Sequence, residues 1–314
     1  MSTVITLGAG ASHSAKFPVG TKLIEQIARK YHDDSFIKIL KRIIWNNRGI
    51  LRQKYSNLIR GSILDKMQND AFKFYKGIVP EFTEWLYHLP SAGTIDDFIY
   101  HRPEFSVFAK LGILAVLSDN EKPEFFEPNS LGEITRTWYD EFWSILRKGC
   151  KTAGDLAKKL NRLTIITFNY DRSFDYFLDC SIHSIYKHSL NGSGCLEALK
   201  IHHVYGSIGD LLNRGYYPIN FNKIPDNSSS FHVGGWENPE FLPPEYGQFI
   251  KFDQHILSAS LGIKTYNEEF MGESGNKYMD IIQSASYLYI LEIIYPYFAD
   301  EKQTRKNIDR MHFE

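Results

Sequence analysis

Residues 4–20 read "VITLGAGASHSAKFPVG", a short apolar run that passes directly into glycine, alanine and serine. When a strand ends in a tight glycine turn and a helix follows, backbone N–H groups can approach a bound phosphate. The same letters also fit an ordinary corner between a strand and a helix. Which of these two interpretations holds depends on the rest of the chain.

The segments on either side of the glycines predict a strand and a helix. The β-branched run at residues 3–7 predicts a buried strand that ends at Gly8. Leucine and isoleucine then recur at helical spacing from Thr21, which we expect to be the N-cap of a helix. Phosphate binding requires this order of strand, glycine turn and helix, so the flanking segments favour that interpretation.

Three later segments also predict strands. Residues 163–178 read "LTIITFNYDRSFDYFL", a β-branched run that reaches the polar residues Asn169 and Asp171 before a helical pattern begins. Residues 201–212 read "IHHVYGSIGDLL" and again pass from apolar residues into glycine and serine. The last strand candidate is "SYLYILEII" at residues 286–294.

The carboxyl ends of parallel strands meet at one edge of a sheet, where doubly wound folds bind their ligands. We therefore expect Gly8–Ser12, Asn169–Asp171 and His203–Ser207 to converge. The fold class predicted is α/β, with a Rossmann-like doubly wound parallel sheet and a large helical insertion. We expect a single domain over residues 1–314, with a core at 1–30, 161–214 and 276–314, a helical insertion at 31–160, and a loop or flap at 215–275.

The composition narrows the class of protein. The chain has 314 residues, 43% of them hydrophobic and 23% charged, with a net charge of −1, which argues against broad electrostatic capture of nucleic acid. Its three cysteines form no CxxC pair, so neither a disulfide framework nor a four-thiolate zinc site is expected. Apolar runs are far shorter than the roughly 20 residues of a membrane helix. These features predict a cytoplasmic protein without a membrane partner.

The order of the motifs resembles the sirtuin-like family, in particular bacterial members that act as NAD-consuming effectors of antiphage defence. The segments that carry the resemblance are "LGAGASHSAKFPVG" (7–20), "TFNYDRSFD" (167–175) and "HVYGSIGDL" (203–211). The resemblance implies a Rossmann-like core with NAD as the substrate. It also implies cofactor-binding residues, which are Gly8, Ala9, Gly10 and Ser12 at the pyrophosphate, Pro18 in the substrate loop, Asn169 beside the nicotinamide ribose, and Gly206 and Ser207 in the third motif.

Three residues are candidates for catalysis. The resemblance places Asn169 where it positions water or the ribose hydroxyls. Asp171 would either take part in catalysis or cap the following helix by accepting backbone N–H bonds. Tyr205 stands where the family carries a histidine, and strand alternation would put His203 on the same face as Tyr205. His203 is therefore either a general base or a structural histidine that bonds a neighbouring carbonyl.

The leading functional hypothesis is hydrolysis of NAD⁺ to nicotinamide and ADP-ribose. The alternative is a catalytically weak or inactive subunit that binds NAD or ADP-ribose, and Tyr205 is the feature in its favour. Protein deacetylation is disfavoured because the paired CxxC motifs of a zinc module are absent, and hydride transfer is ranked last because "GAGASH" has His13 in place of a third glycine.

The resemblance also suggests partners. A hydrolase of NAD needs control, so we expect a homo-oligomer or a complex with a HerA-type ATPase or an Argonaute-like protein. The segment "TIDDF" (94–98) resembles a loop acid that some relatives place near the substrate, but we expect its acids Asp96 and Asp97 to be solvated loop residues. Trp138 and Trp143 are expected to be core residues without a functional role.

Overall fold

The computed structural model describes residues 2–18, 20–47, 71–88, 94–126, 137–186, 195, 198–208, 259–265, 268 and 274–291. The expected flap at 215–275 lies largely outside the described residues, and so does the core segment predicted after residue 291. The statements below concern the described residues.

Four strands form one parallel sheet in the order β3-β2-β1-β4. The strands are β1 (Thr3–Leu7), β2 (Leu163–Thr167), β3 (Lys200–His203) and β4 (Tyr287–Leu291). All four fall where β-branched and aromatic runs predict strands, although β3 ends at His203, well before residue 212. The structure is thus α/β, and this strand order is compatible with a Rossmann-like fold.

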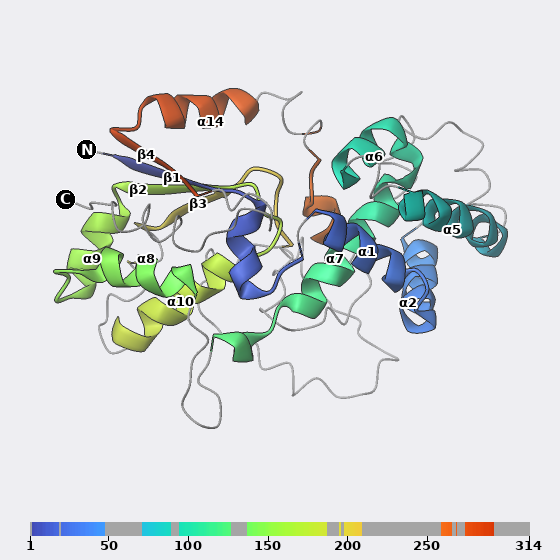
Figure 1. Ribbon diagram of the computed structural model, residues 1–314, viewed down its shortest axis with the longest axis horizontal. Coiled ribbons are helices and arrows are strands. Elements are labelled where there is room, and N and C mark those ends of the chain that lie inside the picture. Colours follow the sequence, from blue (N-terminus) through green and yellow to red (C-terminus); the bar gives the residue numbers. More distant parts are fainter. Residues whose placement is uncertain are drawn as a thin grey trace, which may run out of the picture.

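Helices cover both faces of this sheet (Figure 1). Alternation along the strands sends Val4 and Ile166 to one face, where they pack near α14 (Ser274–Gln283). Ile5 and Ile165 point to the other face and join the main core. That face is covered by α8 (Trp138–Arg147), α9 (Ala153–Leu160) and α10 (Ser173–Tyr186).

The remaining helices form a block beside the sheet, which we call the helical block (Figure 1). Its members are α1 (Thr21–Lys30), α2 (Asp34–Asn46), α5 (Ala71–His88), α6 (Ile95–His101) and α7 (Ser106–Asn120), with short 3₁₀ turns at Pro103–Phe105 and Pro123–Phe125. The described part of residues 31–160 is helical, as the sequence predicts. Yet α8 and α9, which lie inside that range, pack on the sheet instead of joining the block.

The glycine-rich turn after β1 differs from the expected entry into an α-helix. It forms a seven-residue 3₁₀ helix, η1 (Ala9–Ala15), and Gly8 N–H donates to the carbonyl of Leu291 at 3.1 Å. The next helix, α1, includes Thr21, and Gly20 occupies the N-cap position that we expected Thr21 to fill. Gly20 has a φ of 50°, a backbone conformation that favours glycine and so fixes the helix start.

None of the helices in the described part of the chain has the length and apolar character needed to cross a lipid bilayer.

Candidate functional site

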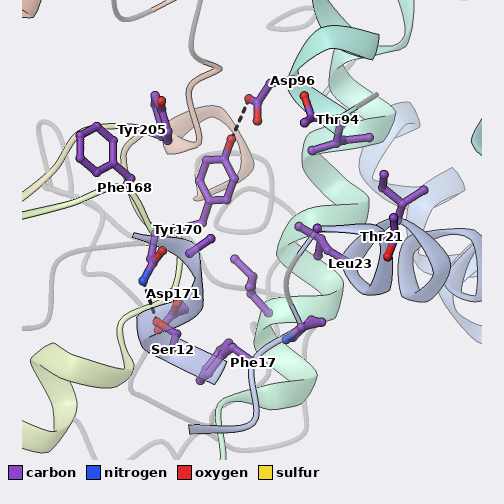
Figure 2. A pocket seen from close by; sticks show the side chains of 17 residues that line it. Ser12, Phe17, Thr21, Leu23, Thr94, Asp96, Phe168, Tyr170, Asp171 and Tyr205 are labelled. Atoms are coloured by element: carbon purple, nitrogen blue, oxygen red, sulfur yellow. Dashed lines mark hydrogen bonds between the residues drawn. The ribbon is translucent and has the colours of Figure 1, made fainter. Parts of the chain in front are cut away.

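A cavity of about 330 Å³ lies between the carboxyl ends of β1 and β2 and the helical block (Figure 2). This volume falls within the range of small-molecule sites. One wall comes from η1 and from the residues after β2 and β3, and the other comes from α1, α6 and α7. The lining residues are Ala9, Ser12, Phe17, Pro18, Gly20, Thr21, Leu23, Ile24, Thr94, Ile95, Asp96, Leu117, Phe168, Asn169, Tyr170, Asp171 and Tyr205.

The structure brings together half of the residues singled out from the sequence. Ala9, Ser12, Pro18, Asn169 and Asp171 all line this cavity, although they come from segments more than 140 residues apart. The expected convergence of the first two strand ends is therefore present. The other candidates, which are Gly8, Gly10, His203, Gly206 and Ser207, are not among the residues that line it.

Asn169, which lines this cavity, has one side-chain atom without a hydrogen-bond partner in the described part of the chain. Its side chain is only 7% exposed, its Nδ2 donates to the Ser12 hydroxyl at 2.8 Å, and its backbone N–H donates to Thr167 Oγ1 at 3.1 Å. Its Oδ1 is buried without a hydrogen-bond partner among the described residues. Leaving an acceptor buried and unpaired costs about 1–3 kcal/mol, so this oxygen favours a ligand or water that donates a hydrogen bond.

Asp171 accepts the backbone N–H bond that was expected of it, but it lies one residue before the N-cap position of α10, which Arg172 occupies. Its Oδ1 accepts from the backbone N–H of Ser173 at 3.0 Å and from the Ser173 hydroxyl, at the start of α10. Burial raises the pKa of this carboxyl, while hydrogen bonds from Ser173 and Ser12 act in the opposite direction. Asp171 therefore orders the turn between β2 and α10 and also forms part of the cavity wall.

His203 makes two hydrogen bonds within the protein. Its Nδ1 lies 3.0 Å from the backbone carbonyl of Asn169, and its Nε2 lies 3.1 Å from Oδ1 of Asp175 on α10. Both partners are acceptors, so the two contacts can be hydrogen bonds at the same time only in the imidazolium form, in which both ring nitrogens carry protons. Burial alone would lower the pKa of His203, but the charge and hydrogen bond of Asp175 raise it to about 9. The carbonyl contact expected of a structural histidine is therefore present.

The expectation that His203 and Tyr205 share a face is wrong. Strand β3 ends at His203, and the chain turns at Val204 and Tyr205, so the alternation of side chains stops there. Tyr205 consequently lines the cavity and packs near Phe168, with ring centroids 5.7 Å apart (Figure 2). His203 instead contacts Asp175 on α10.

Gly206 is required for packing. It has a φ of 68°, and a Cβ at this position would lie 1.9 Å from the carbonyl oxygen of Gly262. The neighbouring Tyr205 carbonyl accepts a hydrogen bond from Lys264 N–H at 2.8 Å. The glycine of the third motif thus allows two backbone segments to meet.

Several lining residues were missed because they lie in the helical block or carry no motif. Asp96, which we expected to be solvated, also lines the cavity and accepts a hydrogen bond of 2.9 Å from the Tyr170 hydroxyl (Figure 2). Burial and the nearby Asp96 carboxyl raise the pKa of Tyr170 well above its usual value, which keeps the phenol a donor. The expectation of solvated acids is wrong for Asp96 and correct for Asp97, which is exposed and caps α6 with Thr94.

Trp138 also contributes more than core volume. Its indole Nε1 donates to the carbonyl of Ala11 at 2.8 Å, and its ring stacks on Phe174 with centroids 5.3 Å apart. The bond fixes the middle of η1, the segment that supplies Ser12 to the site. No local pattern predicts this contact, because the two residues are 127 positions apart.

The charge of the lining is one-sided. The described lining residues include two carboxyl groups, Asp96 and Asp171, and no lysine, arginine or histidine. Among the described residues, no group of three or more histidine, cysteine, aspartate and glutamate side chains is placed to hold a metal ion. The cavity therefore suits a neutral or positively charged ligand group that donates hydrogen bonds.

Comparison with protein-family models, with curated proteins and with solved structures found no match to this chain.

Proposed function

We propose that this protein is an NAD⁺ glycohydrolase. Water replaces nicotinamide at the anomeric carbon of the ribose, so the C–N bond breaks and a C–O bond forms. Nicotinamide departs with the bonding electron pair as a neutral molecule, and the attacking water releases one proton to solvent. The products are nicotinamide, ADP-ribose and that proton.

The buried, unpaired Oδ1 of Asn169 is the observation that carries this proposal. An amide oxygen can accept a hydrogen bond from a ribose hydroxyl or from the attacking water. Because the Nδ2 of the same side chain is already bonded to Ser12, the amide cannot turn without losing that bond. The oxygen is thus held in advance where it can position one of these groups.

The negative charge of the lining supports the proposal that the nicotinamide end of NAD⁺ enters the cavity. The oxidised nicotinamide ring is cationic, and positive charge moves onto the ribose as the glycosidic bond breaks. Carboxyl groups at Asp96 and Asp171 favour positive charge in a cavity that holds no cationic side chain among the described residues. The same carboxyl groups disfavour a phosphate inside the cavity, so we place the diphosphate outside it.

Aromatic rings provide a surface for a flat ligand group. Tyr170 and Tyr205 have ring centroids 6.0 Å apart, and Phe168 lies beside Tyr205. Such rings can pack against the face of nicotinamide and shield the reacting carbon from bulk water. The tyrosine that replaces the family's histidine therefore has a packing role in this proposal.

A second candidate function is an NAD- or ADP-ribose-binding subunit without turnover. The observation in its favour is the state of His203, both of whose nitrogens are occupied by protein acceptors. Glycohydrolysis has less need of a general base than most hydrolyses because nicotinamide is already a good leaving group. We therefore rank the binding subunit second.

The biological setting is part of the same proposal. NAD⁺ is shared by all of metabolism, so its unregulated hydrolysis would be toxic, and depletion of NAD⁺ would suit bacterial antiviral defence. Control would then come from assembly into a homo-oligomer or from a HerA-type ATPase or Argonaute-like partner. Light scattering of the protein alone and after addition of such a partner measures this directly, and full activity in a monomer would contradict it.

The decisive experiment is incubation of the purified protein with NAD⁺, with nicotinamide release followed by chromatography. We expect Asn169→Ala to lower the turnover by about 100-fold, the range seen when a positioned polar group is removed. Asn161→Ala is the matched control, because Asn161 is an exposed asparagine at the end of α9. Equal turnover in the two variants would refute the role of Asn169.

The same preparation separates the two candidate functions. If the wild-type protein releases no nicotinamide in any assembly but binds ADP-ribose in a calorimeter, the binding subunit is correct. If it shows neither turnover nor binding, both candidates fail.

A further inference from the structure

We propose that His203 is a positioning residue, which holds the backbone of Asn169 so that the amide oxygen of that residue faces the cavity. The expected effect of His203 on catalysis rests on the proposed function. Its structural content concerns three groups, the His203 ring, the Asn169 peptide carbonyl and the Asp175 carboxylate, and can be tested without any ligand.

Asn169 is fixed at three of its four hydrogen-bonding positions. Its N–H donates to Thr167 Oγ1 at 3.1 Å, its Nδ2 donates to Ser12 at 2.8 Å, and its carbonyl accepts from His203 at 3.0 Å. Only Oδ1 has no hydrogen-bond partner among the described residues. Because the carbonyl and the side chain leave the same backbone unit, a contact that fixes the carbonyl also limits where the amide oxygen can point.

His203 is itself anchored from the opposite direction. Its Nε2 lies 3.1 Å and 3.2 Å from the two carboxylate oxygens of Asp175, which is 5% exposed on α10. The ring therefore connects the end of β2 to α10 through β3. An asparagine at the end of a short strand gains a rigid support that its own turn does not supply.

The charge on the ring depends on the groups that surround it. Asp175 faces it from α10, Asp171 from the segment after β2, and the neighbouring His202 lies on β3. The carboxyl groups of Asp175 and Asp171 raise the pKa of His203 and so favour the imidazolium. The pKa of His202 is lowered, chiefly by burial and to a smaller extent by nearby positive groups that include His203. Loss of the proton on either ring nitrogen would break one of the two contacts.

A general base would show a different geometry. A neutral imidazole acting as a base must direct an unprotonated nitrogen at the substrate or at water. Both nitrogens of His203 instead lie within 3.2 Å of protein acceptors, and the residue is not part of the cavity lining.

The experiment that tests this inference is nitrogen NMR of the intact protein. In the wild type we expect both ring nitrogens of His203 to be protonated at neutral pH, with a titration near pH 9. The side-chain amide signal of Asn169 should shift together with that titration. A singly protonated ring at neutral pH, or an Asn169 signal that ignores the titration, would overturn the inference.

Asp175→Asn is the variant that separates positioning from simple structure. Removal of the Asp175 charge should lower the pKa of His203 by roughly one to two units, the usual effect of one nearby opposite charge. The pH at which the Asn169 amide signal shifts should fall by the same amount. If the protein is an active hydrolase, the alkaline fall of kcat should move by the same amount, and an unmoved fall would contradict the inference.

His203→Gln and His202→Gln form the matched pair of variants. We expect His203→Gln to lower kcat about 10-fold with a smaller change in KM, because a glutamine can donate to only one of the two acceptors. His202→Gln on the opposite face of β3 should leave kcat unchanged. A complete loss of turnover in a folded His203→Gln protein would instead identify His203 as a base.

The outcomes for the two proposals remain distinct. Absence of nicotinamide release in the wild type refutes the hydrolase, while the ring protonation and the Asn169 signal still decide the positioning role. Turnover in the wild type with an Asn169 signal unaffected by Asp175→Asn supports the hydrolase and refutes positioning by His203.

Discussion

The two walls of the cavity are built by different physical means. The strand-end wall, from η1 and residues 167–173 with His203 behind it, is held by hydrogen bonds between buried polar groups. The helical block on the other side is held by apolar packing, and α7 is buried along nearly its whole length. Directional hydrogen bonds therefore set the positions of the polar atoms at the cavity, while apolar packing stabilises the helices that form the opposite wall.

The strand-end wall and the helical block meet at a few polar links. Tyr170 bonds Asp96 across the cavity, and Arg172 forms a buried bidentate ion pair with Glu121 beyond the end of α7. Both partners of the ion pair are at most 2% exposed in their side chains. Breaking one partner of such a buried pair would leave an uncompensated charge, so these links fix the spacing of the two walls.

The largest effect is expected from Phe82→Ala in the helical block. Phe82 is fully buried and its ring lies within 6.0 Å of the rings of Tyr31, Phe98, Phe105 and Phe108. Truncation should lower the free energy of unfolding by about 3–5 kcal/mol. Urea denaturation measures this loss, and a change below about 1 kcal/mol would show that packing does not hold this wall.

The second effect is a dependence of the free energy of unfolding on pH, caused by His203 behind the strand-end wall. The pKa of His203 is about 9 in the folded protein, against the usual 6.5 that we take for the unfolded chain. Its stabilising contribution is therefore fully present below about pH 6.5 and is lost as the pH rises through 9. At 1.36 kcal/mol per pKa unit, the loss is on the order of 3 kcal/mol.

Other groups also titrate at alkaline pH, so the measurement is a difference. Unfolding in urea at several pH values is compared between the wild type and Asp175→Asn, which lacks the charge that raises the pKa of His203. The wild type should have the larger free energy of unfolding at low pH, and this difference from Asp175→Asn should disappear between pH 6.5 and 10. Parallel pH curves for the two proteins would show that the ion pair contributes nothing.

The smallest effect distinguishes two glycines of the helical block. A Cβ at Gly112 would lie 2.6 Å from Cγ2 of the buried Ile27, so in Gly112→Ala either that side chain or the helix must shift. This should cost about 1–3 kcal/mol, less the roughly 1 kcal/mol gained in helix propensity. Gly77→Ala in α5 meets nothing within 4 Å and should stabilise by up to about 1 kcal/mol.

Thermal unfolding of these two variants compares them directly. The expected result is a lower midpoint for Gly112→Ala and a higher midpoint for Gly77→Ala. A higher midpoint in both would mean that helix propensity outweighs the close approach of α1 and α7, and a lower midpoint in both would contradict the expected gain at Gly77.

Local sequence patterns located the strands and one wall of the site. The β-branched runs before Gly8 and before Asn169 are strands, and the polar residues that follow them line the same cavity, as strand ends of a parallel sheet should. The role of His203 was left open between base and structural residue, because alternation along a strand fails once the strand ends. The contribution of Asp96 was not predicted, because two adjacent acids after a loop are as typical of solvated residues as of a site, and the Tyr170 partner that orients Asp96 lies 74 positions away.

The sequence by itself determined where strands begin and which polar residues follow them, because side-chain period and β-branching act within a few neighbouring residues. Only the tertiary structure decided which atom of Asn169 stays unpaired, which acceptors surround His203, and which helix completes the cavity. These outcomes depend on contacts between residues as far apart as Ser12 and Asn169, which are 157 positions distant in the chain. No local pattern encodes such a contact, since it exists only after the chain has folded.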